Sequence, residues 1–325
     1  ESGDLVASKP ITHAVKCAER SGAPLEIMPT TQWFVKILDQ TEQLKAKAQR
    51  LVLLLDVADL FHEADGLLVG HARIFGLDFA NLEPFVIALD GQPVTPHAPS
   101  DGRVTLGPAM RVDLILDMTG QPGSRVSVVD RFYKGSEYRL GDLAYAEAAL
   151  RKASPDWPLE LQGNPLAEPG LGDAIRHEVT FNGGMMGQMV MAEMSGSMGE
   201  EGSHGMMGNM MNMMHGQGIW FINGKAATGH IMDPLLTLPH GRTCVLAMTN
   251  ATAWHHPIHL HGHSFRVLSR NGQSTAHREW QDTVLMAPRE KVEIAFVADN
   301  PGKWLLHCHM LEHAAAGMQT WFEVI

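Results

Sequence analysis

Short apolar runs separated by turn-forming residues dominate the chain from about His71 onward. The runs at 72–79, 85–94 and 111–118 are rich in valine, isoleucine, leucine and phenylalanine. Glycine, proline and aspartate interrupt them at intervals of about ten to twenty residues, which is typical of antiparallel sandwiches and Greek-key barrels. At 291–297 apolar and polar residues alternate, as they do in a half-buried strand. The pattern therefore predicts a mainly β protein.

The apolar runs fall into two groups, which predict two β domains at 51–150 and 175–325. From residue 134 to 173 the sequence is irregular and rich in proline, and we place the connection between the domains at 151–174. The second domain begins near Ile175 and resumes at Ile219 after an insert at 184–218.

The first fifty residues follow a different pattern. From about Thr31 to Phe61 apolar residues recur at spacings of three and four, which favours a helix. Because this local pattern disagrees with the rest of the chain, we interpret residues 1–50 as an appended or misjoined segment, partly helical, that packs wherever its apolar side fits.

Two histidine-rich clusters lie near the C-terminal end of the chain. The first is Trp-His-His-Pro-Ile-His-Leu-His-Gly-His at 254–263, with candidate ligands His256, His259 and His261. The second is His-Cys-His-Met-Leu-Glu-His-Ala-Ala-Ala-Gly-Met at 307–318, with candidate ligands His307, Cys308, His309, His313 and Met318. A thiolate, several imidazoles and a thioether form a ligand set for copper.

The spacing of the second cluster predicts two separate sites. Lys303 to Met310 reads as a strand after a Pro-Gly turn, and residues two apart on a strand share a face. His307 and His309 then point one way and Cys308 points the other way. One strand can therefore hold two copper sites on opposite sides, joined by the backbone of the cysteine.

The cysteine side of this strand suits a trigonal copper site with a weak axial ligand. Cys308, His256 and His313 would form the trigonal plane, and Met318 would be the axial ligand. Cys308, His313 and Met318 follow one another at intervals of five residues, as in a ligand set that runs from a strand into a loop.

His-Pro-Ile-His-Leu-His-Gly and His-Cys-His-x3-His-x4-Met resemble the third and fourth copper motifs of the multicopper oxidases, the laccase and cuprous oxidase family. The resemblance covers roughly residues 70–325. It implies two cupredoxin-like domains, of which only 175–325 holds copper. It assigns the type 1 copper to His256, Cys308, His313 and Met318, the type 2 copper to His259, and the type 3 pair to His261, His307 and His309.

The resemblance also implies a function. Family members are copper-dependent oxidoreductases that take electrons singly from a donor, here a phenol or Cu(I), at the type 1 site. The electrons pass through Cys308 and the flanking His307 and His309 to a trinuclear cluster that reduces dioxygen to water. Asp282 matches an acidic position of the family, where we expect it to orient a histidine or to support substrate.

The sequence departs from the family in the trinuclear ligand set. The family supplies four more histidines as two His-x-His pairs from a first domain, and no two histidines before residue 180 have that spacing. We therefore expect the first cupredoxin domain to be missing. Cys17–Glu26 and Thr31–Leu38 resemble instead a piece of valyl-tRNA synthetase, but both ATP-binding signatures of that enzyme class are absent, so aminoacylation is not expected.

The insert at 184–218 contains twelve of the chain's twenty methionines, with His204 and His215 among them. Thioethers select Cu(I), so the insert can gather cuprous ions as substrate. The alternative is a flexible loop that partly covers the site and binds nothing specific. Three functions remain open: a laccase-like oxidase, a blue-copper electron-transfer module with an incomplete trinuclear centre, and a copper-handling protein based on this insert.

Composition and charge limit which partners and which cellular location we expect for this protein. A formal charge of −11 argues against nucleic acid, and no apolar run is long enough to span a membrane. Three cysteines are too few for a disulfide framework. The first residues lack the pattern of a signal peptide, whereas bacterial relatives are usually exported, so we expect a periplasmic or secreted protein. The sequence leaves a homo-oligomer open.

Overall fold

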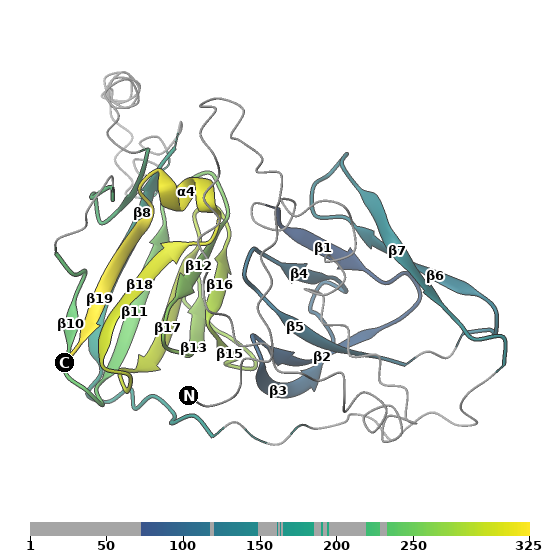
Figure 1. The fold of residues 1–325 in the computed structure, drawn as a ribbon, viewed down its shortest axis with the longest axis horizontal. Coiled ribbons are helices and arrows are strands. Elements are labelled where there is room, and N and C mark those ends of the chain that lie inside the picture. Colours follow the sequence, from purple (N-terminus) through teal and green to yellow (C-terminus); the bar gives the residue numbers. More distant parts are fainter. Residues whose placement is uncertain are drawn as a thin grey trace, which may run out of the picture. The chain divides into compact units, whose positions relative to one another are not determined.

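The computed structural model describes residues 73–117, 120–148, 161, 163, 165–184, 190, 194, 219–227 and 233–325. These residues form mainly β structure (Figure 1), as the sequence predicts. The expected helix near the N-terminus and nearly all of the methionine-rich insert lie outside the described residues. Within the described residues, no helix is long and apolar enough to cross a membrane.

The first described domain contains two antiparallel sheets. Its strands are β1 (Phe75–Asp78), β2 (Pro84–Leu89), β3 (Gln92–His97), β4 (Val104–Leu106), β5 (Val112–Leu116), β6 (Arg125–Asp130) and β7 (Tyr138–Ala144). One sheet has the order β4-β1-β6-β7 and the other the order β3-β2-β5. Alternate apolar residues of these strands, such as Leu77, Leu114 and Val128, are buried together as one core.

Strand β7 corrects the sequence interpretation, which treats residues from 134 onward as irregular. β7 pairs with β6 along its whole length, from Arg125 opposite Ala144 to Asp130 opposite Tyr138. The strand lies at the edge of its sheet, none of its side chains is fully buried, and Gly141 interrupts its pattern of apolar residues. An edge strand with little burial needs no clear apolar pattern, which is why the sequence did not reveal it.

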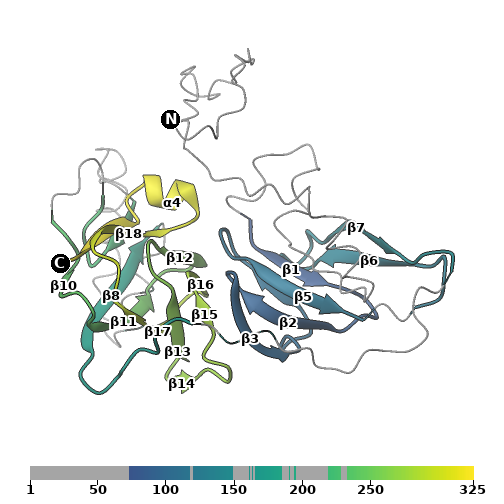
Figure 2. The ribbon, with the colours of Figure 1, turned by 60° about the horizontal axis from the view of Figure 1, so that its bottom comes forward.

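The second domain has a larger sheet and a five-stranded sheet, both visible in Figure 2. Its elements are β8 (Ile175–Gly183), β9 (Trp220–Ile222), β10 (Thr237–Leu238), β11 (Thr243–Asn250), β12 (His256–Leu260), β13 (Phe265–Arg270), β14 (Gln273–Ser274), β15 (Trp280–Gln281), β16 (Thr283–Met286), β17 (Lys291–Val297), β18 (Gly302–Cys308), α4 (Leu311–Ala315) and β19 (Gln319–Val324). The larger sheet runs β14-β13-β17-β11-β8-β9, with β15 also paired to β13. The other runs β10-β19-β18-β12-β16.

The core of the second domain lies between strands of these two sheets. Phe181 of β8, Phe265 of β13 and Phe322 of β19 are buried in one cluster. β17 shows the predicted alternation over its first residues, but Ile294, Ala295 and Phe296 are all buried. Because successive side chains of a strand point to opposite faces, burial of Ala295 between Ile294 and Phe296 means that this part of β17 is covered on both faces of the sheet.

Candidate metal centre

The two histidine-rich clusters of the sequence lie on neighbouring strands. β12 and β18 pair antiparallel in the five-stranded sheet, with Ile258 opposite Cys308 and His259 opposite His307. Helix α4 follows β18 directly and carries His313. The pairing of the strands therefore brings together residues that are about fifty positions apart in the sequence.

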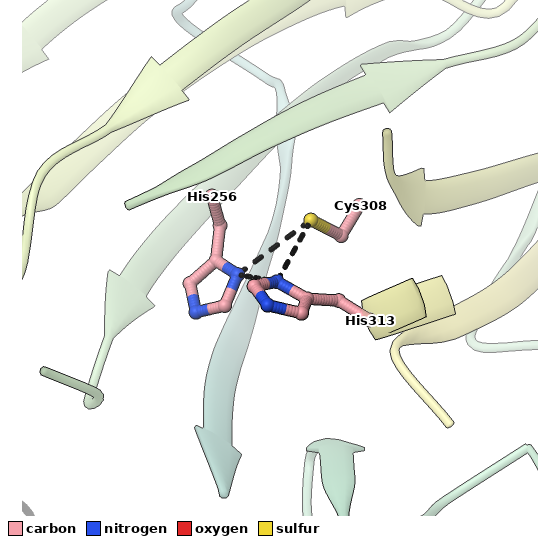
Figure 3. A group of neighbouring side chains, drawn as sticks. All are labelled: His256, Cys308 and His313. Carbon is pink, nitrogen blue, oxygen red and sulfur yellow. Dashed lines mark hydrogen bonds between the residues drawn. The ribbon is translucent and has the colours of Figure 1, made fainter. Parts of the chain in front are cut away.

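His256, Cys308 and His313 form one compact group, which we call the thiol cluster (Figure 3). The Nδ1 atoms of His256 and His313 lie 3.5 and 3.6 Å from Sγ of Cys308, and 3.1 Å from each other. Metal–ligand bonds of roughly 2.0–2.3 Å to nitrogen and sulfur place the atoms of a trigonal plane roughly 3.5 Å apart. The donor atoms therefore fit a single metal ion, and the thiol with two imidazoles suits copper.

A chain of buried hydrogen bonds fixes which nitrogen of His256 faces the cysteine. Asn250 donates its Nδ2–H to the carbonyl oxygen of Ala287 (2.8 Å), so its Oδ1 is free to accept the hydroxyl proton of Thr252 (2.7 Å). The Thr252 oxygen then accepts from Nε2–H of His256 (2.8 Å). With the proton on Nε2, the lone pair of His256 lies on Nδ1, toward Cys308. Asn250 and Thr252 were not predicted from the sequence, where their only signal is their place just before the first cluster.

Met318, the predicted axial ligand, is fully buried in the same core as Cys308. The backbone of Met318 is hydrogen-bonded to both Cys308 and His313. Its carbonyl oxygen accepts from Cys308 N–H (3.0 Å), and its N–H donates to the carbonyl of His313 (2.9 Å). The fold therefore keeps Met318 beside the thiol cluster, while its role as an axial ligand remains a prediction.

An indole ring covers the two imidazoles of the thiol cluster. The ring of Trp220 lies 4.3 Å from that of His313 and 5.1 Å from that of His256, measured between centroids. Burial lowers the pKa of both histidines and raises the pKa of the Cys308 thiol to about 12. The imidazoles are therefore neutral and able to bind metal at neutral pH, whereas the thiol has to lose a proton.

His259, His261, His307 and His309 form a second group, which we call the imidazole cluster. The ring centroid of His259 lies 4.7 Å from that of His261, 5.7 Å from that of His307 and 5.8 Å from that of His309. Nε2 of His261 lies 3.0 Å from Nε2 of His307, while Nδ1 of His307 faces the carbonyl oxygen of Cys308 (2.9 Å). The ligands expected for the type 2 and type 3 coppers thus lie together, with lone pairs that can converge.

Strand β18 ends at Cys308, two residues before the predicted end of this strand. His309 still runs alongside β12, because its N–H donates to the carbonyl of Pro257 (2.7 Å). The sequence-based separation of faces agrees with the contacts: Cys308 meets His256 and His313, whereas His307 meets His261.

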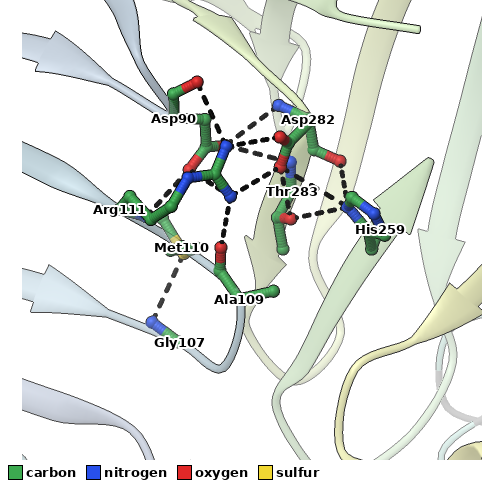
Figure 4. A network of polar contacts seen from close by, with 8 residues as sticks. All are labelled: Asp90, Gly107, Ala109, Met110, Arg111, His259, Asp282 and Thr283. Carbon is green, nitrogen blue, oxygen red and sulfur yellow. Dashed lines mark hydrogen bonds and ion pairs between the residues drawn. The ribbon is translucent and has the colours of Figure 1, made fainter. Parts of the chain in front are cut away.

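Asp282 and Thr283 hold the ring of His259 (Figure 4). Nδ1 of His259 lies 2.9 Å from the carbonyl oxygen of Asp282, 2.9 Å from Oγ1 of Thr283, and 3.4 Å from Oδ1 of Asp282. A carbonyl oxygen can only accept, so Nδ1 carries the proton and Nε2 is left for a metal. Burial opposes ionisation of Asp282, but hydrogen bonds from His259, Arg111 and Thr283 outweigh it and hold the pKa of this carboxyl well below its usual range.

A cavity of about 330 Å³ adjoins His259 and Asp282. Its lining includes Trp280, His263 and Ser264, and it opens to solvent, so a small molecule such as water or dioxygen has space beside His259, the member of the imidazole cluster that lines it.

A two-sheet β domain with a cysteine and two imidazoles gathered at the end of a strand defines a copper protein of the cupredoxin class. The Multicopper oxidase family model matches residues 203–325. The multicopper oxidase MmcO of Mycobacterium tuberculosis is 40% identical over 106 residues, which are 33% of this chain and 20% of that protein. The crystal structure of a multi-copper oxidase from Pseudomonas thermotolerans is similar over 78% of this chain and 52% of that chain, with a TM-score of 0.61 and 27% identity.

Residues 203–325 therefore match the multicopper oxidase family, which implies copper as the cofactor, and the structural likeness extends over most of the chain. The chain spans about half the length of that solved relative. A valine–tRNA ligase of Wolbachia pipientis wMel is 61% identical over 49 residues, which are 15% of this chain and 6% of that protein. This ligase is of the same enzyme family, the valyl-tRNA synthetases, that Cys17–Glu26 and Thr31–Leu38 resemble.

Proposed function

We propose that this chain is a laccase-like multicopper oxidase that accepts electrons one at a time from a phenolic donor or Cu(I) and passes them to dioxygen, which is reduced to water. The proposal depends mainly on one observation. The thiol cluster and the imidazole cluster are joined covalently, because Cys308 of the first is flanked in the chain by His307 and His309 of the second.

In this proposal His256, Cys308, His313 and Met318 hold the type 1 copper, which supplies one-electron redox chemistry when bound. Burial of His256 and Cys308 excludes water from this site. His313 is only partly buried, so its edge is the part of the thiol cluster nearest to a donor in solution. The backbone of Cys308 then provides the shortest covalent route to the imidazole cluster.

His259, His261, His307 and His309 would hold the type 2 and type 3 coppers, with Asp282 fixing the proton on Nδ1 of His259. The adjoining cavity gives dioxygen space to approach His259. By analogy with the exported relatives, we also infer a periplasmic or secreted location.

The small number of imidazoles in the imidazole cluster favours a second function, that of an electron-transfer protein. The described residues bring four histidines together there, and the chain has no His-x-His pair before residue 180. A chain that completes only the type 1 site would be a blue-copper electron-transfer protein that is reduced and reoxidised without turnover.

The deciding experiment measures copper per chain after anaerobic Cu(I) loading, together with the visible and paramagnetic-resonance spectra and oxygen uptake with a phenolic donor. The oxidase predicts several coppers, a type 2 signal and steady uptake, of which the uptake depends on Cys308. Cys308→Ser should abolish the blue band and the uptake. Cys244→Ser is the matched control, because Cys244 is also a fully buried free thiol but lies on β11, outside both clusters. One blue copper without a type 2 signal or uptake would leave only the electron-transfer function.

A further inference from the structure

The domain without copper motifs contacts the segment that holds His259. Asp90 and Gly91 form the tight turn between β2 and β3, with positive φ angles of 49° and 75°. This conformation is typical of an Asp-Gly hairpin turn. The turn directs the Asp90 carboxylate toward the second domain, where its Oδ2 accepts the backbone N–H of Asp282 (2.9 Å) and of Thr283 (3.0 Å).

Asp90 is itself held in place by Arg111, which precedes β5. Oδ1 of Asp90 accepts the backbone N–H of Arg111 (2.8 Å), and the backbone N–H of Asp90 donates to the carbonyl of Arg111 (2.9 Å). Asp90 is only 5% exposed. Both oxygens of its carboxylate accept hydrogen bonds from backbone N–H groups, Oδ1 within its own domain and Oδ2 from the second domain. Charge-assisted hydrogen bonds of this kind fix geometry well.

The guanidinium of Arg111 forms an ion pair with the Asp282 side chain (Figure 4). Nη2 of Arg111 lies 2.6 Å from Oδ2 of Asp282 and Nη1 lies 3.4 Å from Oδ1. The same two nitrogens donate to the carbonyl oxygens of Asp90 (3.1 Å) and Ala109 (2.9 Å). The contacts to the two carbonyl oxygens fix the orientation of the guanidinium. Its contact with the Asp282 carboxylate is bidentate and therefore directional.

Each partner of His259 Nδ1 belongs to the segment held in this way. The carbonyl and carboxylate of Asp282 and the hydroxyl of Thr283 surround that nitrogen, and the Thr283 hydroxyl in turn donates to Oδ1 of Asp282 (2.8 Å). A displacement of residues 282–283 would therefore remove the contacts that set the orientation of the ring and the position of its proton.

We infer that the first domain, which contains β1 to β7, positions His259. Asp90 accepts hydrogen bonds from the backbone of residues 282–283, and Arg111 donates to the Asp282 carboxylate. Asp90 and Arg111 are thus positioning residues that act through Asp282, and the first domain contributes to the metal centre without supplying a ligand. The inference rests on the proposed function in one respect, the role of His259 as a metal ligand.

The test follows the imidazole nitrogens of His259 in the copper-free protein by NMR, with ¹⁵N-labelled histidine and with His259→Asn for assignment. In the unchanged protein we expect the single tautomer with the proton on Nδ1. In Arg111→Gln and in Asp90→Asn we expect the ¹⁵N shifts to move toward the average of the two tautomers. Zn(II), used as a probe of the imidazole cluster in a Cys308→Ser background, should then bind roughly 10–100-fold more weakly.

Two controls separate positioning from general damage. Arg131→Gln removes an exposed ion pair with Asp78 in the same domain (2.8 Å) and should leave His259 unchanged. His256, which is held by Thr252 in the second domain, serves as an internal reference and should keep its shifts in every variant.

Unchanged His259 shifts in both Arg111→Gln and Asp90→Asn would overturn the inference, as would an equal movement of His256 and His259. The tautomer measurement uses no copper and no oxygen. A chain that proves to lack oxidase activity can therefore still show the positioning effect, and the two proposals can fail separately.

Discussion

A single hydroxyl group determines how the thiol cluster presents His256. Thr252 accepts from the ring and is hydrogen-bonded to Asn250, and all three side chains are fully buried. The amide of Asn250 donates to the carbonyl oxygens of Trp254 and Ala287, so the Thr252 hydroxyl donates either to Asn250 Oδ1 or to the Trp254 carbonyl (3.1 Å), and in both cases its oxygen accepts from His256. The residue that decides the metal-binding nitrogen is therefore one that has no ligand chemistry of its own.

Replacement of Thr252 tests this role. Thr252→Val keeps the shape of the side chain but leaves His256 Nε2 without its partner and Asn250 Oδ1 with only the backbone N–H of residue 252 (3.1 Å), which should cost about 1–3 kcal/mol in the free energy of unfolding. Copper affinity at the thiol cluster should fall roughly 10–100-fold. Thr252→Ser retains the hydroxyl and should preserve most of the affinity. Competition with a Cu(I) chelator measures both variants, and equal affinities for Val and Ser would contradict the role.

The pKa of Cys308 predicts how copper binding depends on pH. Burial raises this thiol pKa to about 12, so the unloaded protein holds the proton at neutral pH, whereas copper binds the thiolate. Burial lowers the pKa values of His256 and His313, so these rings release no proton on binding above about pH 6.5. One proton is therefore released per copper, and the apparent Kd should fall about tenfold for each pH unit.

A titration of Cu(I) between pH 6.5 and 8.5, against a chelator calibrated at each pH, checks this slope. Cys308→Ser should remove both the tight binding and its pH dependence. An affinity that does not change with pH would mean that the thiol is already ionised in the unloaded protein.

At the scale of elements, the turn between α4 and β19 brings His313 and Met318 back to Cys308. Gly317 occupies this turn with φ of +122°, and a Cβ there would lie 2.3 Å from the carbonyl oxygen of Trp220. Both the backbone conformation and the close approach require glycine. The turn therefore sets the contact between β9, which carries Trp220, and the segment that carries the ligands.

Gly317→Ala should destabilise the protein by at least about 1–3 kcal/mol, since it adds a clash to the strain of the backbone. The blue band should weaken, because His313 and Met318 flank the substituted residue. Gly272→Ala is the control: Gly272 also has positive φ (+77°), but a Cβ there meets nothing within 4 Å. Thermal unfolding and the visible spectrum distinguish the two, and similar losses in both variants would show that strain alone is responsible.

For the molecule as a whole, the sequence predicts those parts of the site that depend on local order. The mainly β fold follows from the short apolar runs between turn residues, and the opposite directions of Cys308 and His307 follow from alternation along one strand. Asp90 and Arg111 could not be predicted in this way. They lie more than 170 residues from Asp282 in the sequence and meet it only when two domains are in contact.

The register between β12 and β18 has a consequence for how such a protein can change over generations. Because Ile258 lies opposite Cys308 and His259 opposite His307, a one-residue insertion or deletion within either strand would turn every following side chain to the other face of the sheet. Histidines of one cluster would then face the other. Gains and losses of residues should therefore be confined to the ends of strands, as with the long methionine-rich insert between β8 and β9, while β12 and β18 keep their length as substitutions accumulate around them.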